Sequence, residues 1–314
     1  MGETTVPDVL SGRDTSIALP GDGERRPDRF IVPPIDRDDT GLLGQRVDGH
    51  RLVSVLGAGG TGVVFRAEGD DGAIAVKVLR KKHGPDSDAA QRFLRESRLE
   101  GLRHPNIVTV RSAGLLEDGR PYLTMELLRG ESLERRLGRE VQLPIEDAVR
   151  ITREVLAGLG AAHEAGVVHR DVKPANVFLA ETGEGTVAKL LDFSVARVAA
   201  QGGARVTATG DIVGTPLYLA PEQATGVKTQ DHRVDVWAAG VLLYHLLTGE
   251  PPFASKQLAE LILKIVSETP RDPRSIRDEI PEPLAEVVRR ALKKPVSERY
   301  ASAREMARAL SDAC

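Results

Sequence analysis

The sequence of 314 residues predicts an α+β fold with two lobes, in which a small antiparallel β-sheet lobe with one main helix precedes a larger, mainly α-helical lobe. Two observations lead to this prediction. Between residue 45 and about residue 125, alternating segments and glycine-rich turns indicate strands. After residue 130, apolar residues instead recur at helical spacing. Such a division creates a cleft between the lobes, where a ligand can bind.

The composition narrows the class of protein. Hydrophobic residues make up 41% of the chain and charged residues 28%, which is ordinary for a soluble globular protein. The net charge of −3 argues against a nucleic-acid-binding protein.

Cys314 is the only cysteine, so we expect neither an internal disulfide nor a thiolate metal site. The longest uncharged apolar run, 236–249, is too short to cross a bilayer, so we expect a cytoplasmic protein with no membrane span within this chain.

Residues 1–44 differ from the rest. The first 40 residues contain nine acidic residues, five basic residues and five prolines, and their apolar residues follow no regular period. This composition predicts a disordered tail or linker. The folded domain is then expected over 45–314, with the small lobe over about 45–125, a connection at 126–130 and the large lobe over 131–314.

The small lobe is expected to contain strands on both sides of a glycine cluster. A turn at Asp70-Asp71-Gly72 leads into a further strand, AIAVKVL. An amphipathic helix follows over 86–102, and two more strands are expected over 107–113 and 122–127.

The large lobe is expected to consist of helices. A helical stripe of apolar residues extends from Ile145 to Ala162. The segment 234–247 is apolar on nearly all sides, which predicts a buried central helix. Shorter amphipathic helices are expected over 258–266, 284–292 and 302–310.

The glycine cluster is the first chemical signal. In LGAGGTGVV, Gly57, Gly59 and Gly62 form a G-x-G-x-x-G pattern, which allows a backbone to approach phosphate oxygens closely. A strand follows it, whereas a dinucleotide-binding fold needs a helix there, and the Gly-Lys-Ser/Thr ending of a Walker loop is missing. Lys77 lies fifteen residues after Gly62, in the middle of a strand and on the same face as Ala75. We expect Lys77 to face the cleft. The alternative for the glycine cluster is a flexible turn without a ligand, and the alternative for Lys77 is a lysine on the surface.

A second signal is the polar run HRDVKPANVF, which begins at His169. It places five polar side chains within eight residues, between segments that look buried. Polar groups next to a core are costly unless they are paired or used. This pattern favours a functional loop, with a plain surface loop as the alternative.

Together, IAVK after the glycine loop and HRDVKPAN about ninety residues later make the sequence similar to the eukaryotic-type (Hanks-type) protein kinases. The resemblance extends from residue 52 to about residue 310, and HRDVKPANVF and GTPLYLAPEQ are most similar to the bacterial serine/threonine branch. It implies a two-lobed kinase fold and a signalling enzyme. The enzyme would transfer the γ-phosphate of ATP to serine or threonine hydroxyls of proteins, its own chain included, with Mg²⁺, or Mn²⁺ in its place, as cofactor.

The resemblance also implies which residues carry the chemistry. They are the phosphate-binding Lys77, its helix partner Glu96, the catalytic base Asp171, Lys173 beside the γ-phosphate, and the metal ligands Asn176 and Asp192. Phosphoryl transfer passes through a loose transition state, so positioning and cations supply most of the catalysis. Carboxylate and amide oxygens suit Mg²⁺.

The same resemblance implies an ATP pocket. Its residues come from the glycine loop, the following strands, the connection between the lobes and the segment after the polar run, and they are Leu56, Gly57, Gly59, Gly62, Val64, Ala75, Met125, Glu126, Leu128 and Phe178. For Met125 and Phe178, simple core packing is compatible with this role.

A segment of 31 residues from Asp192 to Glu222 resembles an activation segment. The resemblance implies phosphorylation sites at Thr207 and Thr209 in this segment, with Arg170 as the partner of the new phosphate. It implies that Thr215 lies near the base and marks specificity for serine and threonine. It also implies an ion pair between Glu222 and Arg299 and a role for Asp235 in supporting the catalytic loop.

The chain departs from the family pattern at two positions. Ser194 replaces the usual glycine after Asp192-Phe193, and a left-handed backbone there costs a serine roughly 1–2 kcal/mol. We expect Asp192 nevertheless to stay in the cleft. The first helix is one residue short, so Arg95 competes with Glu96 for the position that faces Lys77, and we expect Glu96 there.

These departures leave two alternatives to an active protein kinase. One is a pseudokinase that acts as a nucleotide-binding scaffold. The other is a small-molecule kinase of related fold, which the long segment before Glu222 disfavours. Dimerisation is left open by the sequence.

Overall fold

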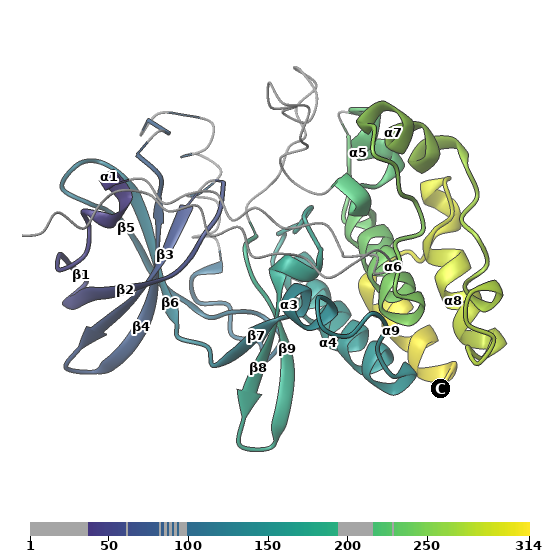
Figure 1. Ribbon diagram of the computed structural model, residues 1–314, viewed down its shortest axis with the longest axis horizontal. Helices are drawn as coiled ribbons and strands as arrows, with labels where there is room; N and C mark the ends of the chain where they lie inside the picture. Colours follow the sequence, from purple (N-terminus) through teal and green to yellow (C-terminus); the bar gives the residue numbers. More distant parts are fainter. Residues whose placement is uncertain are drawn as a thin grey trace, which may run out of the picture. The chain divides into compact units, whose positions relative to one another are not determined.

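The computed structural model describes residues 37–314 except 61, 82, 85–86, 88–89, 91–92, 94–98, 194–215 and 228 (Figure 1). The described part contains an antiparallel sheet of six strands, a second antiparallel sheet of three strands, and a set of helices that form most of the C-terminal half. The two-lobed α+β fold predicted from the sequence is therefore confirmed.

The six-stranded sheet has the strand order β1-β2-β3-β4-β6-β5. Its strands are β1 (Arg46–Val47), β2 (His50–Ala58), β3 (Gly62–Gly69), β4 (Gly72–Leu79), β5 (Val110–Leu115) and β6 (Pro121–Glu126). Alternating residues such as Val63, Phe65 and Ala67 on β3 are buried, and they pack with Ile74 and Val76 of β4. This period of two is the pattern that the sequence analysis used for these strands.

The chain enters this sheet through a short helix that the sequence analysis did not expect. Helix α1 (Arg37–Thr40) precedes Leu42, which is 3% exposed and belongs to the core of the six-stranded sheet. The backbone N–H of Gly44 donates to the carbonyl of Leu52 at 2.8 Å. Residues 37–44 are thus part of the folded unit, in place of the unstructured linker that we expected up to residue 44. Residues 1–36 lie outside the described residues.

The helix expected over 86–102 is described only in part. Ala90 and Phe93 are helical and buried, and Leu99 is 2% exposed, which agrees with an apolar face turned toward the core. Arg95 and Glu96 lie outside the described residues, so the competition between them for the position that faces Lys77 stays a prediction.

A second sheet of three strands was missed by the sequence analysis. Its order is β7-β8-β9, with β7 (Gly130–Ser132), β8 (Val177–Thr182) and β9 (Gly185–Leu190) all antiparallel. Strand β8 follows the polar run directly, after the 3₁₀ turn η2 (Pro174–Asn176). Strand β9 ends two residues before Asp192. The hairpin therefore carries both ends of the candidate catalytic machinery.

The large lobe is built from the helices that the sequence predicted, together with two short ones. The helices are α3 (Leu133–Leu137), α4 (Ile145–Glu164), α5 (Pro221–Ala224), α6 (Arg233–Thr248), α7 (Leu258–Ser267), α8 (Glu282–Ala291) and α9 (Ala303–Asp312). Figure 1 shows α6 among the other helices, and nearly all of its residues are buried. It is the central helix expected from its apolar sequence. Within the described part, no helix combines the length and the apolar character needed to cross a membrane.

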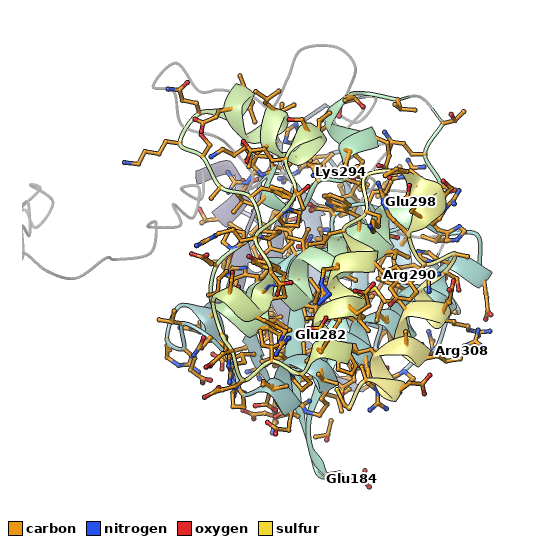
Figure 2. All side chains as sticks on the ribbon, turned by 90° about the vertical axis from the view of Figure 1, so that its right-hand side faces the viewer. Glu184, Glu282, Arg290, Lys294, Glu298 and Arg308 are labelled. Atoms are coloured by element: carbon orange, nitrogen blue, oxygen red, sulfur yellow. The ribbon has the colours of Figure 1, made fainter. Side chains whose placement is uncertain are left out.

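The outer faces of α8 and α9 carry charge. The side chains of Glu282, Arg290 and Arg308 can be followed on this side of the molecule in Figure 2. On the opposite faces, Leu284 and Val288 of α8 and Met306 and Leu310 of α9 are buried. This division into a polar face and an apolar face is the amphipathic pattern that predicted α8 and α9.

Gly130 is fixed by a close approach of two strands. Its φ is +126°, and a methyl group there would overlap the carbonyl oxygen of Leu179 on β8. We expect Gly130→Ala to lower the free energy of unfolding by about 3 kcal/mol, through backbone strain and displacement of β8. Gly138→Ala is the control, because Gly138 has a φ of −66° and a methyl group there would lie 3.4 Å from the nearest atom. Urea denaturation of both variants checks this, and equal stabilities would contradict the expectation.

Candidate active site

The lysine of β4 is buried beneath the glycine-rich turn. Lys77 is 3% exposed, and its Nζ lies 2.6 Å from Oδ1 of Asp192. A methyl group on Gly62 would lie 3.5 Å from Cγ of Lys77, so the end of the turn rests on this side chain. The ring of Phe93 lies 5.5 Å from Nζ. The strand alternation had predicted this inward orientation of Lys77.

The glycine-rich turn joins β2 and β3 and leaves its backbone accessible. The N–H of Gly59 donates to the carbonyl of Gly62 at 2.8 Å, which closes the turn. A methyl group on Gly57 would meet no atom within 4 Å, and the side chain of Leu56 is half exposed. Among the described glycines of this turn, none has a positive φ. The glycines therefore provide room above the backbone, which suits a bulky polar ligand.

Three residues of the polar run meet at one carboxylate. Nζ of Lys173 lies 3.0 Å and 2.8 Å from the two oxygens of Asp171. Nδ2 of Asn176 donates to Oδ2 of Asp171 and to its backbone carbonyl, each at 2.8 Å. The side chain of Asp171 remains 31% exposed, so a substrate can reach it. This loop is a built cluster of polar groups, and the plain surface loop considered from the sequence is excluded.

Asp235 of α6 holds the polar run from below. Its side chain is fully buried, and it accepts hydrogen bonds from the backbone N–H groups of His169 at 2.9 Å and Arg170 at 2.6 Å. Arg170 has a φ of +64°, a conformation that L-residues rarely adopt. The two bonds to Asp235 stabilise this strained backbone. His163 of α4 places Nε2 2.7 Å from Asp235, a contact that the sequence analysis missed.

Asp192 links the second sheet to Lys77. Its φ is +51°, and the preceding carbonyl, that of Leu191, lies 2.8 Å from Nε2 of His169. Burial by itself raises the pKa of the Asp192 carboxyl, but the ammonium of Lys77 beside it outweighs burial and holds this pKa below its usual range. Asp192 is therefore a carboxylate that faces Lys77. Ser194 lies outside the described residues.

The connection between the lobes is braced by a side chain. Glu126 ends β6, and its Oε1 accepts from the N–H of Thr109 at 2.8 Å and from Nζ of Lys189 at 2.9 Å. Lys189 is on β9 and pairs in register with Phe178. The sequence predicted Glu126 as a pocket residue but did not predict its contact with Lys189. The strand alternation of β9 was the signal that could have found it, since Lys189 stands between the buried residues Ala188 and Leu190.

The other predicted pocket residues lie where β3, β4 and β6 adjoin. Ala75 is paired in register with Met125, and Val64 with Lys77. Phe178 and Leu128 are half-buried. The four predicted residues Glu96, Thr207, Thr209 and Thr215 lie outside the described residues.

The segment after the candidate activation loop is fixed to the large lobe by an ion pair. Nη1 and Nη2 of Arg299 each lie 2.7 Å from one carboxylate oxygen of Glu222, and the arginine side chain is fully buried. The guanidinium also lies 4.9 Å from the ring centroid of Trp237. Next to Glu222, Gln223 donates Nε2 to the carbonyl of Arg170 at 3.1 Å. This segment is thereby joined to the polar run.

A second anchor of this segment was not expected from the sequence. The hydroxyl of Tyr218, in the 3₁₀ turn η3 (Pro216–Tyr218), lies 2.6 Å from Nδ1 of His245 on α6. Burial lowers the pKa of His245 to about 4. The imidazole is therefore neutral near pH 7, and its Nδ1 shares a neutral hydrogen bond with the hydroxyl of Tyr218.

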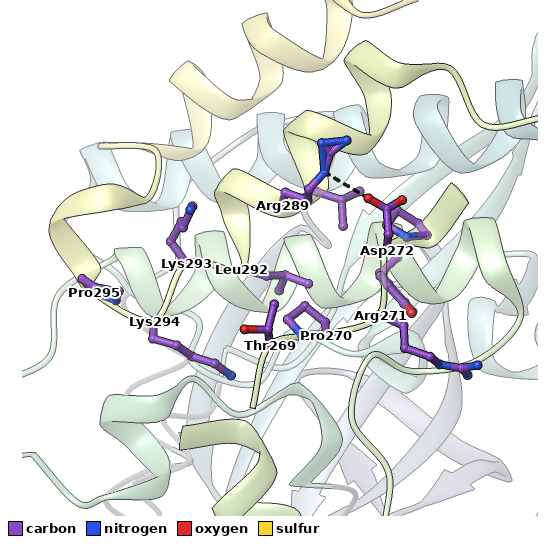
Figure 3. A pocket seen from close by; sticks show the side chains of 12 residues that line it. Thr269, Pro270, Arg271, Asp272, Arg289, Leu292, Lys293, Lys294 and Pro295 are labelled. Atoms are coloured by element: carbon purple, nitrogen blue, oxygen red, sulfur yellow. Dashed lines mark ion pairs between the residues drawn. The ribbon is translucent and has the colours of Figure 1, made fainter. Parts of the chain in front are cut away.

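A separate cavity of about 380 Å³ lies in the large lobe, lined by α6, α8 and the segments 269–273 and 292–295 (Figure 3). An ion pair between Arg289 and Asp272, 3.4 Å long, lies at one side of it. Nζ of Lys294 lies 4.0 Å from the ring centroid of Phe253. The cavity includes none of the residues predicted for the site.

The assembled groups suit a polyphosphate with a divalent cation. Two ammonium groups, those of Lys77 and Lys173, each contact a carboxylate, and the carboxylates of Asp171 and Asp192 come from adjacent segments. Ammonium groups attract phosphate oxygens, and carboxylate and amide oxygens coordinate hard cations.

Comparison with known proteins agrees with this chemistry. The protein kinase domain family matches residues 50–310. The chain is 41% identical over 275 residues to the serine/threonine-protein kinase PkaA of Streptomyces coelicolor, which covers 83% of this chain and 49% of that protein. Over 262 residues it is 38% identical to the serine/threonine-protein kinase pkn3 of Myxococcus xanthus, with 81% and 48% covered. The chain thus spans about half the length of these curated relatives.

Asp235 should be essential for the conformation of the polar run. In Asp235→Asn, the neutral amide loses charge-assisted hydrogen bonds to two backbone N–H groups, so we expect the free energy of unfolding to fall by roughly 2–4 kcal/mol. Asp231→Asn is the control, because Asp231 is 43% exposed and its ion pair with Arg233 should contribute less than about 1 kcal/mol. Denaturant titration measures both variants. A loss in Asp231→Asn as large as that in Asp235→Asn would contradict this role.

His245 should make stability depend on pH. Its pKa in the folded protein, about 4, lies below the ordinary value of 6.5, so the unfolded chain binds the proton more tightly. The stabilisation is complete above pH 6.5 and is lost as the pH falls toward 4, by about 3 kcal/mol in total. In His245→Gln the side-chain amide can also form a hydrogen bond with Tyr218, but it does not titrate. Thermal denaturation from pH 7 to pH 4 should show a steeper loss for the wild type, and parallel curves would disprove this assignment.

Proposed function

Because the chain belongs to the protein kinase family, we propose that it transfers the γ-phosphate of ATP to serine and threonine hydroxyls of proteins. The observation that carries this proposal is the ion pair between Lys77 and Asp192, which brings the small-lobe sheet to the end of β9. The cluster of Asp171, Lys173 and Asn176 supports it further. The substrates of the whole protein are part of the proposal, since the chain spans about half of its relatives.

In this proposal, ATP lies beneath the glycine-rich turn. The open backbone of Gly57 and Gly59 would cover the phosphates, and Lys77 would bind the α- and β-phosphates with its ammonium. The adenine would lie between the apolar side chains of the small lobe and Phe178, beside the backbone of residues 126–128. The brace of Glu126 by Lys189 supports this arrangement, because it fixes the segment that would bind the base.

The residues present fit a divalent cation. Asn176 uses Nδ2 for both of its hydrogen bonds, and its Oδ1 accepts none from the described residues. This oxygen and the carboxylate of Asp192 are hard donors that would hold Mg²⁺, or Mn²⁺ in its place. The cation would neutralise charge on the phosphate oxygens.

Asp171 would act as the catalytic base. Its carboxylate is partly exposed and is oriented by Lys173 and Asn176, so it can accept the proton of a substrate hydroxyl. Lys173, held beside the same carboxylate, would contact the γ-phosphate and stabilise the charge that develops on its oxygens. We also propose that the protein is located in the cytoplasm, because the proposed reaction requires ATP.

Regulation through the segment 192–222 belongs to the same proposal. Nε of Arg170 is buried and has no hydrogen-bond partner among the described residues. A phosphate on Thr207 or Thr209 would supply one, which would order the segment. The same chain is a candidate catalyst for transfer of the γ-phosphate of ATP to these threonines. Glu96 as partner of Lys77 and Thr215 as partner of the base remain predictions from the sequence.

One assay tests the function directly. Wild-type protein should transfer radioactive phosphate from ATP to a generic protein substrate and to itself. Lys77→Met and Asp171→Asn should lower the rate by about 100-fold or more. The first removes the ammonium that would bind the phosphates, and the second removes the base that would accept the hydroxyl proton. Lys256→Met, on an exposed lysine, is the control and should retain the wild-type rate. Nucleotide binding without transfer by the wild type would instead indicate a pseudokinase.

A further inference from the structure

Two buried arginines lie side by side at one end of the six-stranded sheet. Arg80 follows β4 and is 2% exposed, and Arg120 precedes β6 and is 5% exposed. Strands β4 and β6 are paired in register, with Lys77 opposite Leu123 and Val78 opposite Tyr122. Continued by two residues, this register places Arg80 opposite Arg120. Like charges in this arrangement repel each other and weaken the strand pair.

The buried carboxylate of Asp39 contacts both guanidinium groups. Oδ1 of Asp39 is 3.2 Å from Nη1 of Arg120, and Oδ2 is 3.8 Å from Nε of Arg80. Asp39 is itself only 2% exposed. A second carboxylate, that of Asp118, contacts Nε of Arg120 at 2.8 Å, but its side chain is 43% exposed. Asp39 is thus the buried counter-charge that the two ends share.

Asp39 comes from outside the part of the chain that the family matches. It lies on α1, whereas the match begins at residue 50. The segment is held in place by the burial of Leu42 and by the hydrogen bond from Gly44 to Leu52. The carboxylate is therefore delivered by an ordered extension of the sheet, which the matched domain alone does not contain.

We propose that Asp39 is a positioning residue for nucleotide binding, which acts by holding together the ends of β4 and β6 beside Lys77. Lys77 is three residues from Arg80 on the same strand, so separation of the strand ends would displace the backbone that carries its ammonium. This inference rests on the proposed function, in which Lys77 binds the phosphates of ATP. It gives residues 37–44 a role in the site through Arg80 and Arg120, which are not themselves among the predicted site residues.

The test compares full-length variants in steady-state kinetics and in binding of a fluorescent ATP analogue. Asp39→Asn removes the negative charge that both guanidinium groups contact and so strengthens the repulsion between them. We therefore expect KM for ATP and Kd for the analogue to rise on the order of tenfold. The value of kcat should change far less, because saturating ATP restores the bound geometry. Asp118→Asn is the matched control, since Asp118 contacts Arg120 but not Arg80, and its KM should equal that of the wild type.

A second substitution separates charge balance from a general loss of structure. Arg80→Met removes the repulsion, so Asp39→Asn combined with Arg80→Met should recover most of the affinity that Asp39→Asn loses. A Kd for Asp39→Asn equal to that of the wild type would overturn the proposal, and so would a double variant no better than the single one. If Asp39→Asn alone fails to fold, the double variant decides the question: a Kd close to that of the wild type supports the proposal, and a Kd about tenfold higher overturns it. A wild type that binds the analogue but transfers no phosphate would refute the proposed function only, since the Kd values still test Asp39.

Discussion

The ion pair between Lys77 and Asp192 is the constraint on which the site depends. Lys77 is buried on β4, and a buried ammonium is destabilising unless a carboxylate accompanies it. Asp192 supplies that carboxylate from the segment after β9, at 2.6 Å. Two parts of the chain 115 residues apart are thus brought to a common place. In the proposed function, the open backbone above Lys77 and the polar run would bind the same charged ligand.

A second carboxylate maintains the backbone on the large-lobe side. Asp235, on the central helix, accepts hydrogen bonds from two successive backbone N–H groups of the polar run. Its carboxylate also contacts Nε2 of His163. Without these bonds, the left-handed conformation of Arg170 would be costly. Strain of this kind is characteristic of functional sites, where surrounding structure holds a backbone in a conformation that its sequence alone disfavours. The rigidity of α6, buried on all sides, is what makes Asp235 an effective support.

Much of the fold could be predicted because its signals are local. The apolar segment 234–247 predicts a buried helix from its own composition, and the alternation around Lys77 predicts its orientation. Strand β7 was missed because it has only three residues and pairs with a segment about 50 residues further along the chain. Strands β8 and β9 form a local hairpin, and their sequence signal was overlooked. Helix α1 was missed because its residues look like a solvated acidic linker, and Asp39 has its partners 41 and 81 residues further along the chain. The roles of the site residues came from resemblance, whereas partners such as Lys189 and His245 appear only once the strands and helices are packed.

In the proposed site, Lys77 and Asp192 bind the same nucleotide. Protection of Lys77 from an amine-reactive reagent, followed by mass spectrometry of the modified peptide, tests this most directly. We expect ATP with Mg²⁺ to protect Lys77 in the wild type, and we expect this protection to be largely lost in Asp192→Asn, where the carboxylate proposed to bind the metal is missing. Equal modification of Lys77 with and without nucleotide in the wild type would contradict it.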